Sequence, residues 1–370
     1  MRRVKSVSQH VASYERHRPT YEAFSLKLKE LLNSILDANK LKVHSIESRA
    51  KTIESFQEKV TRSGKVYNNP LSELHDLCGC RIITYYADEV GKVADILKAE
   101  FSVIEEELGH QVSELDVDRF GYLSVHYVIK VGGNRVGLPE WRAFESMCAE
   151  VQIRTIIQHA WSAISHFIQY KQETAVPSHI QRRLYRIAGL FELADEEFLG
   201  IRDQKAALKA SAAKAIAEGR KGIPLSSSSI SEAIKAWSER DAALSAAVDA
   251  GFQLLKDQED IDSNSDNYVG YIYSLATRLN INTVDDLLLI VNKVDLSLLE
   301  TVFSINKDKV NWMVSENFIF YMLLIAAAGD AVDVEYLSKN GISAEIAKLI
   351  LRGLRMKPRS RRRGTKAGSE

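Results

Sequence analysis

The sequence predicts an α+β fold, with a mixed β-sheet flanked by helices and followed by a mainly α-helical C-terminal domain. Between residues 77 and 155, apolar or alternating segments of strand length surround one helical segment. After residue 156, apolar residues recur at helical spacing almost to Arg355. A chain of 370 residues is also long enough for two domains.

The N-terminal elements follow from local periodicity. Residues 1–40 are predicted as helix, and a second helix is predicted through SIESRAKTIESFQEKVTRSG, residues 45–64. Strands are predicted in LCGCRIITYY, FSVIEEELG, YLSVHYVIKV and MCAEVQIRT, with a helix in DEVGKVADILKAE between the first two. Helices return in IIQHAWSAISHFIQYK and in the long segment that begins HIQRRLYRIAGLF. The apolar residues that define the first helix are Phe24, Leu28, Leu31, Leu32 and Ile35.

A linker is predicted at EGRKGIPLSSSS, residues 218–229, because glycine, proline and serine interrupt the periodicity. It divides an N-terminal domain at 1–217 from a helical domain at 230–356. Residues 226–356 carry 11 basic and 19 acidic side chains, a net charge of −8 (11 minus 19). The basic tail, residues 357–370, is expected to be disordered.

Composition excludes several classes of protein. The three cysteines show no paired spacing of metal ligands and lie in apolar, strand-like segments, which is typical of reduced thiols in the cytoplasm. The longest apolar run, FIFYMLLIAAAG from Phe318, is too short to span a bilayer, so we expect a cytoplasmic protein with no membrane contact. Asn292, Lys293 and Asp295 match the guanine-reading motif of small GTPases, but no phosphate-binding loop precedes them and we interpret the match as chance.

Cationic side chains are grouped on the predicted second helix. Lys51, Ser55 and Lys59 are spaced i, i+4 and i+8, which places two cations and a hydroxyl on one face. Such a face suits a polyphosphate, because successive oxygens find successive donors. A solvated basic surface would show the same spacing.

Two carboxylates and one polar strand face complete the pattern. Asp76 stands at the mouth of an apolar strand, and Glu150 begins EVQIRT, in which Gln152 and Arg154 share its face. The two carboxylates could hold Mg²⁺ between substrate phosphates, although a turn cap and a salt-bridged surface are the alternatives. In FGYLSVHYVIK, Tyr122 could offer its ring for a base to stack on.

In combination, these segments resemble the RelA/SpoT-type nucleotide pyrophosphokinases, the alarmone synthetase family. The matching segments are RAKTIESFQEK, DLCGCRII, GYLSVHYVI, EVQIRTIIQHAWSAISH and LYRIAGLFELADEEF, in that order. They span about Leu41 to Asp203, which is the whole catalytic domain of that family.

The resemblance implies transfer of the β,γ-pyrophosphate of ATP to the ribose 3′-hydroxyl of GDP or GTP, giving (p)ppGpp, with Mg²⁺ as cofactor. Asp76 and Glu150 would be the catalytic and metal-binding residues, and Glu150 would help to deprotonate the attacking hydroxyl. By motif, the ATP-binding residues would be Arg49, Lys51, Ser55, Lys59 and Arg81, and the acceptor-binding residues Tyr122, His126 and Arg154.

The acceptor stays open at this point. Leu123 replaces the basic or polar residue that usually follows the Gly-Tyr pair, and Arg119 and Phe120 also depart from the common pattern. Some members of the family are toxins that modify the 3′ end of tRNA, and others use adenine nucleotides. A degenerate fold that only binds ligands is a further alternative. The resemblance also leaves room for homo-oligomers and for an acidic C-terminal domain that restrains the catalytic one.

Overall fold

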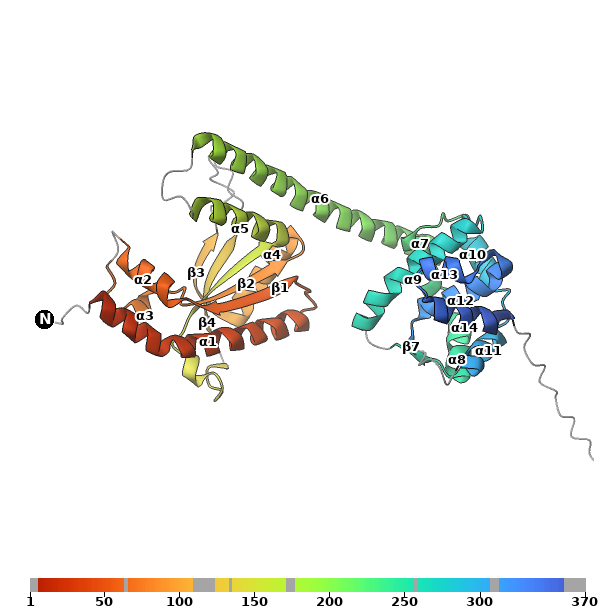
Figure 1. Ribbon diagram of the computed structural model, residues 1–370, viewed down its shortest axis with the longest axis horizontal. Coiled ribbons are helices and arrows are strands. Elements are labelled where there is room, and N and C mark those ends of the chain that lie inside the picture. The colour runs from red at the N-terminus through yellow and green to blue at the C-terminus, as the bar shows by residue number, and fades with distance from the viewer. Residues whose placement is uncertain are drawn as a thin grey trace, which may run out of the picture. The chain divides into compact units, whose positions relative to one another are not determined.

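The computed structural model describes residues 6–62, 66–108, 124–132, 135–170, 177–255, 258–306 and 313–355. The chain forms two compact units, Met1–Arg202 and Asp203–Glu370 (Figure 1). The N-terminal unit combines a five-stranded sheet with helices, and the C-terminal unit is almost entirely helical. The predicted α+β fold is confirmed.

The elements of the N-terminal unit alternate along the chain. Its strands are β1 (Ser45–Ala50), β2 (Cys78–Thr84), β3 (Phe101–Leu108), β4 (Val125–Val131) and β5 (Ala149–Thr155). Its helices are α1 (Val7–Ala38), α2 (Ile53–Thr61), α3 (Pro70–Glu73), α4 (Ala87–Glu100), the short 3₁₀ helix η3 (Arg142–Phe144), α5 (Ile156–Tyr170) and the first part of α6 (Ser178–Ala217). The four strands predicted from sequence are all present.

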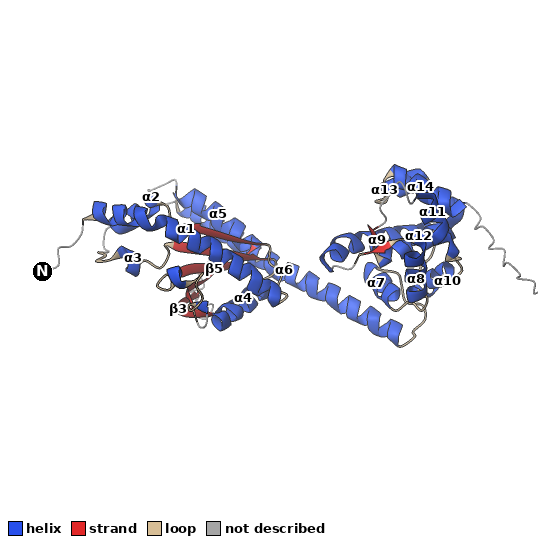
Figure 2. Ribbon diagram, turned by 90° about the horizontal axis from the view of Figure 1, so that it is seen from below, coloured by secondary structure: helices blue, strands red, loops and turns tan. Residues whose placement is uncertain are grey.

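The sheet is mixed, with strand order β1-β2-β5-β4-β3. Strands β2 and β5 run parallel at its centre, and the other neighbours are antiparallel. One face is apolar and buries Cys80, Ile82, Val151 and Tyr127 against helices α1 and α4. Figure 2 shows α1 lying across the strands. Because successive side chains alternate between faces, the polar residues of the central strands gather on the opposite face.

The structure corrects the predicted second helix. Residues 45–50 form the edge strand β1, which pairs antiparallel with β2 and places Glu47 opposite Arg81. Helix α2 begins only at Ile53, where the Thr52 side chain accepts from the Ser55 backbone N–H. Lys51 therefore precedes the helix and does not share its face with Lys59. Pairing with a buried strand overrides the helical preference of SIESRA, which contains few β-branched residues.

The threonine that ends β5 also begins α5. The Thr155 hydroxyl accepts from the Gln158 N–H at 3.1 Å, while the Gln158 side chain accepts from the Thr155 N–H at 2.8 Å. This reciprocal pair satisfies two donors at the start of the helix. The same hydroxyl donates to Asp195 on α6 at 2.8 Å, and all these atoms are buried or half-buried. EVQIRT thus connects the sheet to both helices that follow it.

The C-terminal unit packs helices around one central helix. Its elements after α6 are α7 (Ser227–Lys235), α8 (Arg240–Ala250), β6 (Gln253–Leu254), α9 (Gln258–Arg278), α10 (Val284–Val291), α11 (Ser297–Asn306), β7 (Met313–Val314), α12 (Glu316–Ala328), η4 (Gly329–Ala331), α13 (Val334–Lys339) and α14 (Ala344–Arg355). In α12 every side chain from Asn317 to Ile325 is buried. A helix that is apolar all round belongs in a core. The described residues include no helix long and apolar enough to cross a membrane.

Part of the predicted linker has regular structure. Ser226 is the N-cap of α7 and accepts from the Ser229 N–H, so the three serines that follow it in the predicted linker form the first turn of the helix. The chain boundary between the two compact units falls inside α6, between Arg202 and Asp203, and the predicted domain division at 217/218 stays a prediction. Asn292 follows α10, and its side-chain oxygen accepts from the Trp237 indole at 2.6 Å, a packing role that matches the interpretation of its motif as chance.

Candidate functional site

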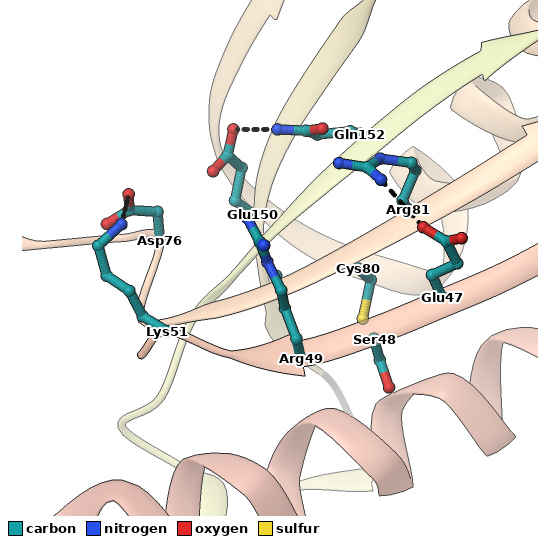
Figure 3. Close-up of a pocket in the computed structure, with 10 residues that line it drawn as sticks. Glu47, Ser48, Arg49, Lys51, Asp76, Cys80, Arg81, Glu150 and Gln152 are labelled. Atoms are coloured by element: carbon teal, nitrogen blue, oxygen red, sulfur yellow. Dashed lines mark hydrogen bonds and ion pairs between the residues drawn. The ribbon is translucent and has the colours of Figure 1, made fainter. Parts of the chain in front are cut away.

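Two adjoining cavities lie on the polar face of the sheet, and Asp76 and Glu150 line both of them. The first cavity extends over β1 and β2, and the second extends towards α3, β3 and β4. The first is lined by Glu47, Ser48, Arg49, Lys51, Asp76, Gly79, Cys80, Arg81, Glu150 and Gln152 (Figure 3). The second is lined by Lys59, Tyr67, Glu73, Leu74, His75, Asp76, Glu105, His126, Val128 and Glu150.

Asp76 is held by two ammonium groups. Its Oδ2 accepts from Lys51 Nζ at 2.8 Å and from Lys59 Nζ at 2.6 Å, and its side chain is 20% exposed. Burial favours the neutral acid, but the two lysines outweigh it and hold the pKa of Asp76 below its ordinary value. Lys51 and Lys59 therefore converge on one carboxylate although they lie on different elements.

Glu150 ends a chain of hydrogen bonds along β5 and β4. Arg154 donates to Gln152 at 2.6 Å, and Gln152 donates to Glu150 at 3.2 Å. His126, from the neighbouring strand, lies 3.1 Å from the same carboxylate. The His126 contact lowers the pKa of Glu150, against the opposing effect of burial. The polar side chains of EVQIRT thus form a chain of hydrogen bonds that orients Glu150.

The remaining cations line the first cavity or lie beside it. Arg81 donates to Glu47 at 2.9 Å across the β1–β2 pair, and Figure 3 shows this pair further along the sheet than Lys51 and Asp76. Arg49 lies on β1, on the same face as Glu47, and lines the cavity. Three cationic side chains therefore line the first cavity, and they could bind the oxygens of a polyphosphate in exchange for the carboxylates that also line it.

Several predicted site residues lie elsewhere. Tyr122 falls outside the described residues. Ser55 lies in the first turn of α2, where it contacts Thr52 at 3.1 Å, and it is not among the residues that line the two cavities. Arg154 is only 5% exposed and donates to Gln152 and to Ser162. Burial lowers the pKa of Arg154 to about 10, so it remains charged at neutral pH. Its contact with an acceptor stays a prediction.

Sequence reasoning missed several lining residues. Tyr67, which is half-buried, lines the second cavity, as does His75, which pairs with Glu105 at 3.1 Å. Glu47 was missed because β1 was predicted as helix; once the strand is known, its parity with Arg49 places it on the site face. The residues from α3 and β3 carry no local signal, because only the tertiary fold brings them together.

The chemistry of the carboxylates fits a hard divalent cation. Asp76 Oδ1 is buried without a hydrogen-bond partner, and the acid is ionised. Within the described ranges, no group of three or more His, Cys, Asp or Glu residues could hold a metal by itself. Two carboxylates completed by water and substrate phosphates are typical of Mg²⁺ sites. Asp76 and Glu150 are thus the candidate ligands.

Comparisons with known proteins find relatives of the N-terminal unit. Residues 48–175 match the family described as the region found in RelA / SpoT proteins. GTP pyrophosphokinase YwaC of Bacillus subtilis strain 168 is 28% identical over 164 residues, which cover 44% of this chain and 75% of the relative. GTP pyrophosphokinase YjbM of the same organism is 26% identical over 167 residues, covering 44% and 73%.

Solved structures align with the same half of the chain. The small alarmone synthetase 1 from Bacillus subtilis is 25% identical, with a TM-score of 0.43, over 52% of this chain and 97% of that chain. Other structures of that protein hold its product pppGpp or AMPCPP. Together with the family match over residues 48–175, the sequence relatives show that the N-terminal half of this chain contains a RelA/SpoT domain homologous to the small alarmone synthetases.

Proposed function

We propose that the N-terminal unit transfers the β,γ-pyrophosphate of ATP to the ribose 3′-hydroxyl of a guanine nucleotide, GDP or GTP, with Mg²⁺ as cofactor. The observation that carries the proposal is the position of Asp76 and Glu150 in the walls of two adjoining cavities. A transferase with two substrates needs its charged groups at the point where donor and acceptor meet.

The first cavity suits the donor. Arg49 and Lys51 lie in its wall, and Lys59 reaches the shared carboxylate from the second cavity. Arg49 would stack on the adenine, and the two lysines would bind ATP phosphates after leaving Asp76. Arg81, held by Glu47, would support the same cavity. In transfer of this kind, alignment and neutralisation of charge supply most of the catalysis.

The second cavity suits the acceptor. His126 lines it and would meet an acceptor phosphate, while Tyr122 would stack on the acceptor base. The half-buried ring of Tyr67 lies in the wall of the same cavity. The relatives named GTP pyrophosphokinases favour guanine nucleotides as acceptors over tRNA or adenine nucleotides.

Glu150 would act mainly by holding charge in place. Its lowered pKa keeps it a carboxylate at neutral pH, able to accept a hydrogen bond from the attacking 3′-hydroxyl. The same low pKa makes it a weak proton acceptor, because a general base works best with a pKa near the working pH. Mg²⁺ held by Asp76 and Glu150 would supply positive charge beside the transferred phosphates.

Label transfer tests the proposal. Full-length protein, Mg²⁺ and ATP labelled at its terminal phosphate are offered GDP, GTP, ATP or deacylated tRNA separately, with Glu150→Gln as the inactive control. Label on GDP or GTP, absent with the variant, is the expected result. Label found only on tRNA, or only on ATP as acceptor, would show that the acceptor is not a guanine nucleotide. No transfer to any acceptor would refute the enzymatic function.

A further inference from the structure

We infer that Tyr14, on helix α1, is a positioning residue for the donor site, because its buried hydroxyl fixes the main chain at Lys51. The inference rests on the proposed function, since Lys51 is there a ligand of ATP phosphates. Tyr14 lies outside the region of the family match, which begins at residue 48. Tyr14 would therefore act through a contact between α1 and the segment that contains Lys51.

The main chain of Lys51 is held from two sides. Tyr14 Oη donates to the Lys51 carbonyl oxygen at 2.6 Å, and Arg18 Nε donates to the same oxygen at 3.2 Å. On the other side, the Lys51 N–H donates to the Leu77 carbonyl at 2.9 Å. Lys51 is the first of the two residues between β1 and α2, where neither a strand ladder nor a helix would otherwise fix its carbonyl. These contacts replace the missing secondary structure.

The donor is itself rigidly placed. Tyr14 is fully buried, and its ring stacks on Phe56 of α2 with centroids 4.4 Å apart and planes 15° apart. Burial raises the pKa of Tyr14 above its ordinary value, so its hydroxyl stays a donor throughout the physiological range. One side chain therefore links α1 both to the carbonyl of Lys51 and to the helix that carries Lys59.

The hydrogen bond from Tyr14 helps to determine where the ammonium groups of Lys51 and Lys59 lie. Lys51 and Lys59 meet at Asp76 Oδ2, at 2.8 and 2.6 Å, although they lie on either side of the turn into α2. A rotation of the Lys51 peptide would move its Nζ away from this point. Loss of the Tyr14 hydroxyl should therefore weaken ATP binding and leave the acceptor cavity, which Lys51 does not line, unaffected.

The test compares two tyrosines of the same helix. Tyr14→Phe keeps the ring stack and removes only the hydroxyl. Tyr21→Phe is the matched control, because the Tyr21 hydroxyl also donates to a backbone carbonyl, that of Leu71 at 3.4 Å, and neither of these two residues is among those that line the cavities. For the full-length wild-type protein and both variants, KM for ATP, KM for GDP and kcat are measured by label transfer. The dissociation constant for ATP with Mg²⁺ is measured by calorimetry, and the folded fraction is measured by circular dichroism.

The expected result is a rise of about fivefold in KM and dissociation constant for ATP in Tyr14→Phe, the effect of about one hydrogen bond. KM for GDP stays unchanged, and Tyr21→Phe behaves as wild type. A purely structural role would instead lower the folded fraction and kcat with both KM values unchanged, and would overturn the inference. Equal ATP affinity in the two variants would overturn it as well.

The two proposals fail in different ways. If the wild-type protein binds ATP but transfers no label, the pyrophosphokinase function is refuted, while a weaker ATP affinity in Tyr14→Phe than in Tyr21→Phe still supports the positioning role. If the wild-type protein transfers label and both variants match it, only the positioning role is refuted. A wild-type protein that does not bind ATP at all refutes both.

Discussion

Replacing Asp76 with asparagine should separate the stability of the site from its chemistry. The substitution keeps the shape of the side chain but removes the negative charge that Lys51 and Lys59 share. In the resting protein it removes two charge-assisted hydrogen bonds. In the proposed reaction it removes a ligand of Mg²⁺.

The structure sets the size of each effect. Charge-assisted hydrogen bonds contribute about 1.5–3 kcal/mol each when buried. Lys59 is 38% exposed, so solvent screens its share, and the burial of Asp76 opposes ionisation. The expected loss of folding stability is therefore only about 1–2 kcal/mol. Pyrophosphate transfer should fall much further, by roughly a hundredfold or about 3 kcal/mol, because an electrostatic partner of the transition state is lost.

Denaturant unfolding and label transfer measure the two effects side by side. Glu106→Gln is the control, since Glu106 also accepts from a lysine, Lys98 at 2.9 Å, and from the Tyr127 hydroxyl, away from the two cavities. This control should lose stability and keep its transfer rate. An Asp76→Asn protein that transfers pyrophosphate at the wild-type rate with saturating Mg²⁺ would refute the role of Asp76.

The pH dependence of the same variant has a definite sign. The pKa of Asp76 lies below its ordinary value of 3.8, so its ion pairs stabilise the folded state above the unfolded pKa. That stabilisation is lost as the pH falls through the folded value. The difference in stability between wild type and Asp76→Asn should be constant above about pH 5 and should shrink below about pH 4. A difference that grows in acid would contradict the assignment.

Three further predictions concern the rest of the chain. Gly341→Ala should destabilise the C-terminal unit by about 2–4 kcal/mol, because a Cβ would lie 2.1 Å from Tyr271 at a φ of +83°. In thermal unfolding followed as two transitions, one for each unit, only the transition of the C-terminal unit should shift to lower temperature. Thr155→Val should cost about 2 kcal/mol in the N-terminal unit, while Thr155→Ser stays close to wild type. A protein ending at Ala217 should transfer pyrophosphate faster than the full chain if the acidic region restrains it, and equal rates would remove that hypothesis.

The sheet was predictable because its central strands carry strong local signals. Strands β2, β4 and β5 contain apolar runs or strict alternation, and the polar residues of β5, Glu150, Gln152 and Arg154, were correctly placed on one face. The edge strand β1 was not predictable in this way. SIESRA is held as a strand by its partner β2, and a partner far along the chain leaves no mark on local composition.

The site was predictable only in part, for a related reason. The carboxylates and lysines could be named from motifs, but their actual contacts depend on the third dimension. Lys51 and Lys59 meet at Asp76 because of the turn between β1 and α2, not because of helical spacing. Tyr14 contacts Lys51 across 37 positions of sequence, and no periodicity in α1 distinguishes it from an ordinary core tyrosine.

The shared oxygen of Asp76 gives the resting site an internal set of counter-ions. Binding of a metal–nucleotide complex would then be an ion exchange, in which the carboxylate trades two ammonium groups for a metal and the ammonium groups trade the carboxylate for phosphate. A nucleotide that binds without metal would leave the carboxylate without a counter-ion, and a metal that binds without nucleotide would leave the two lysines without one. Metal and nucleotide should therefore each raise the affinity for the other by the same factor, so that neither is held firmly alone.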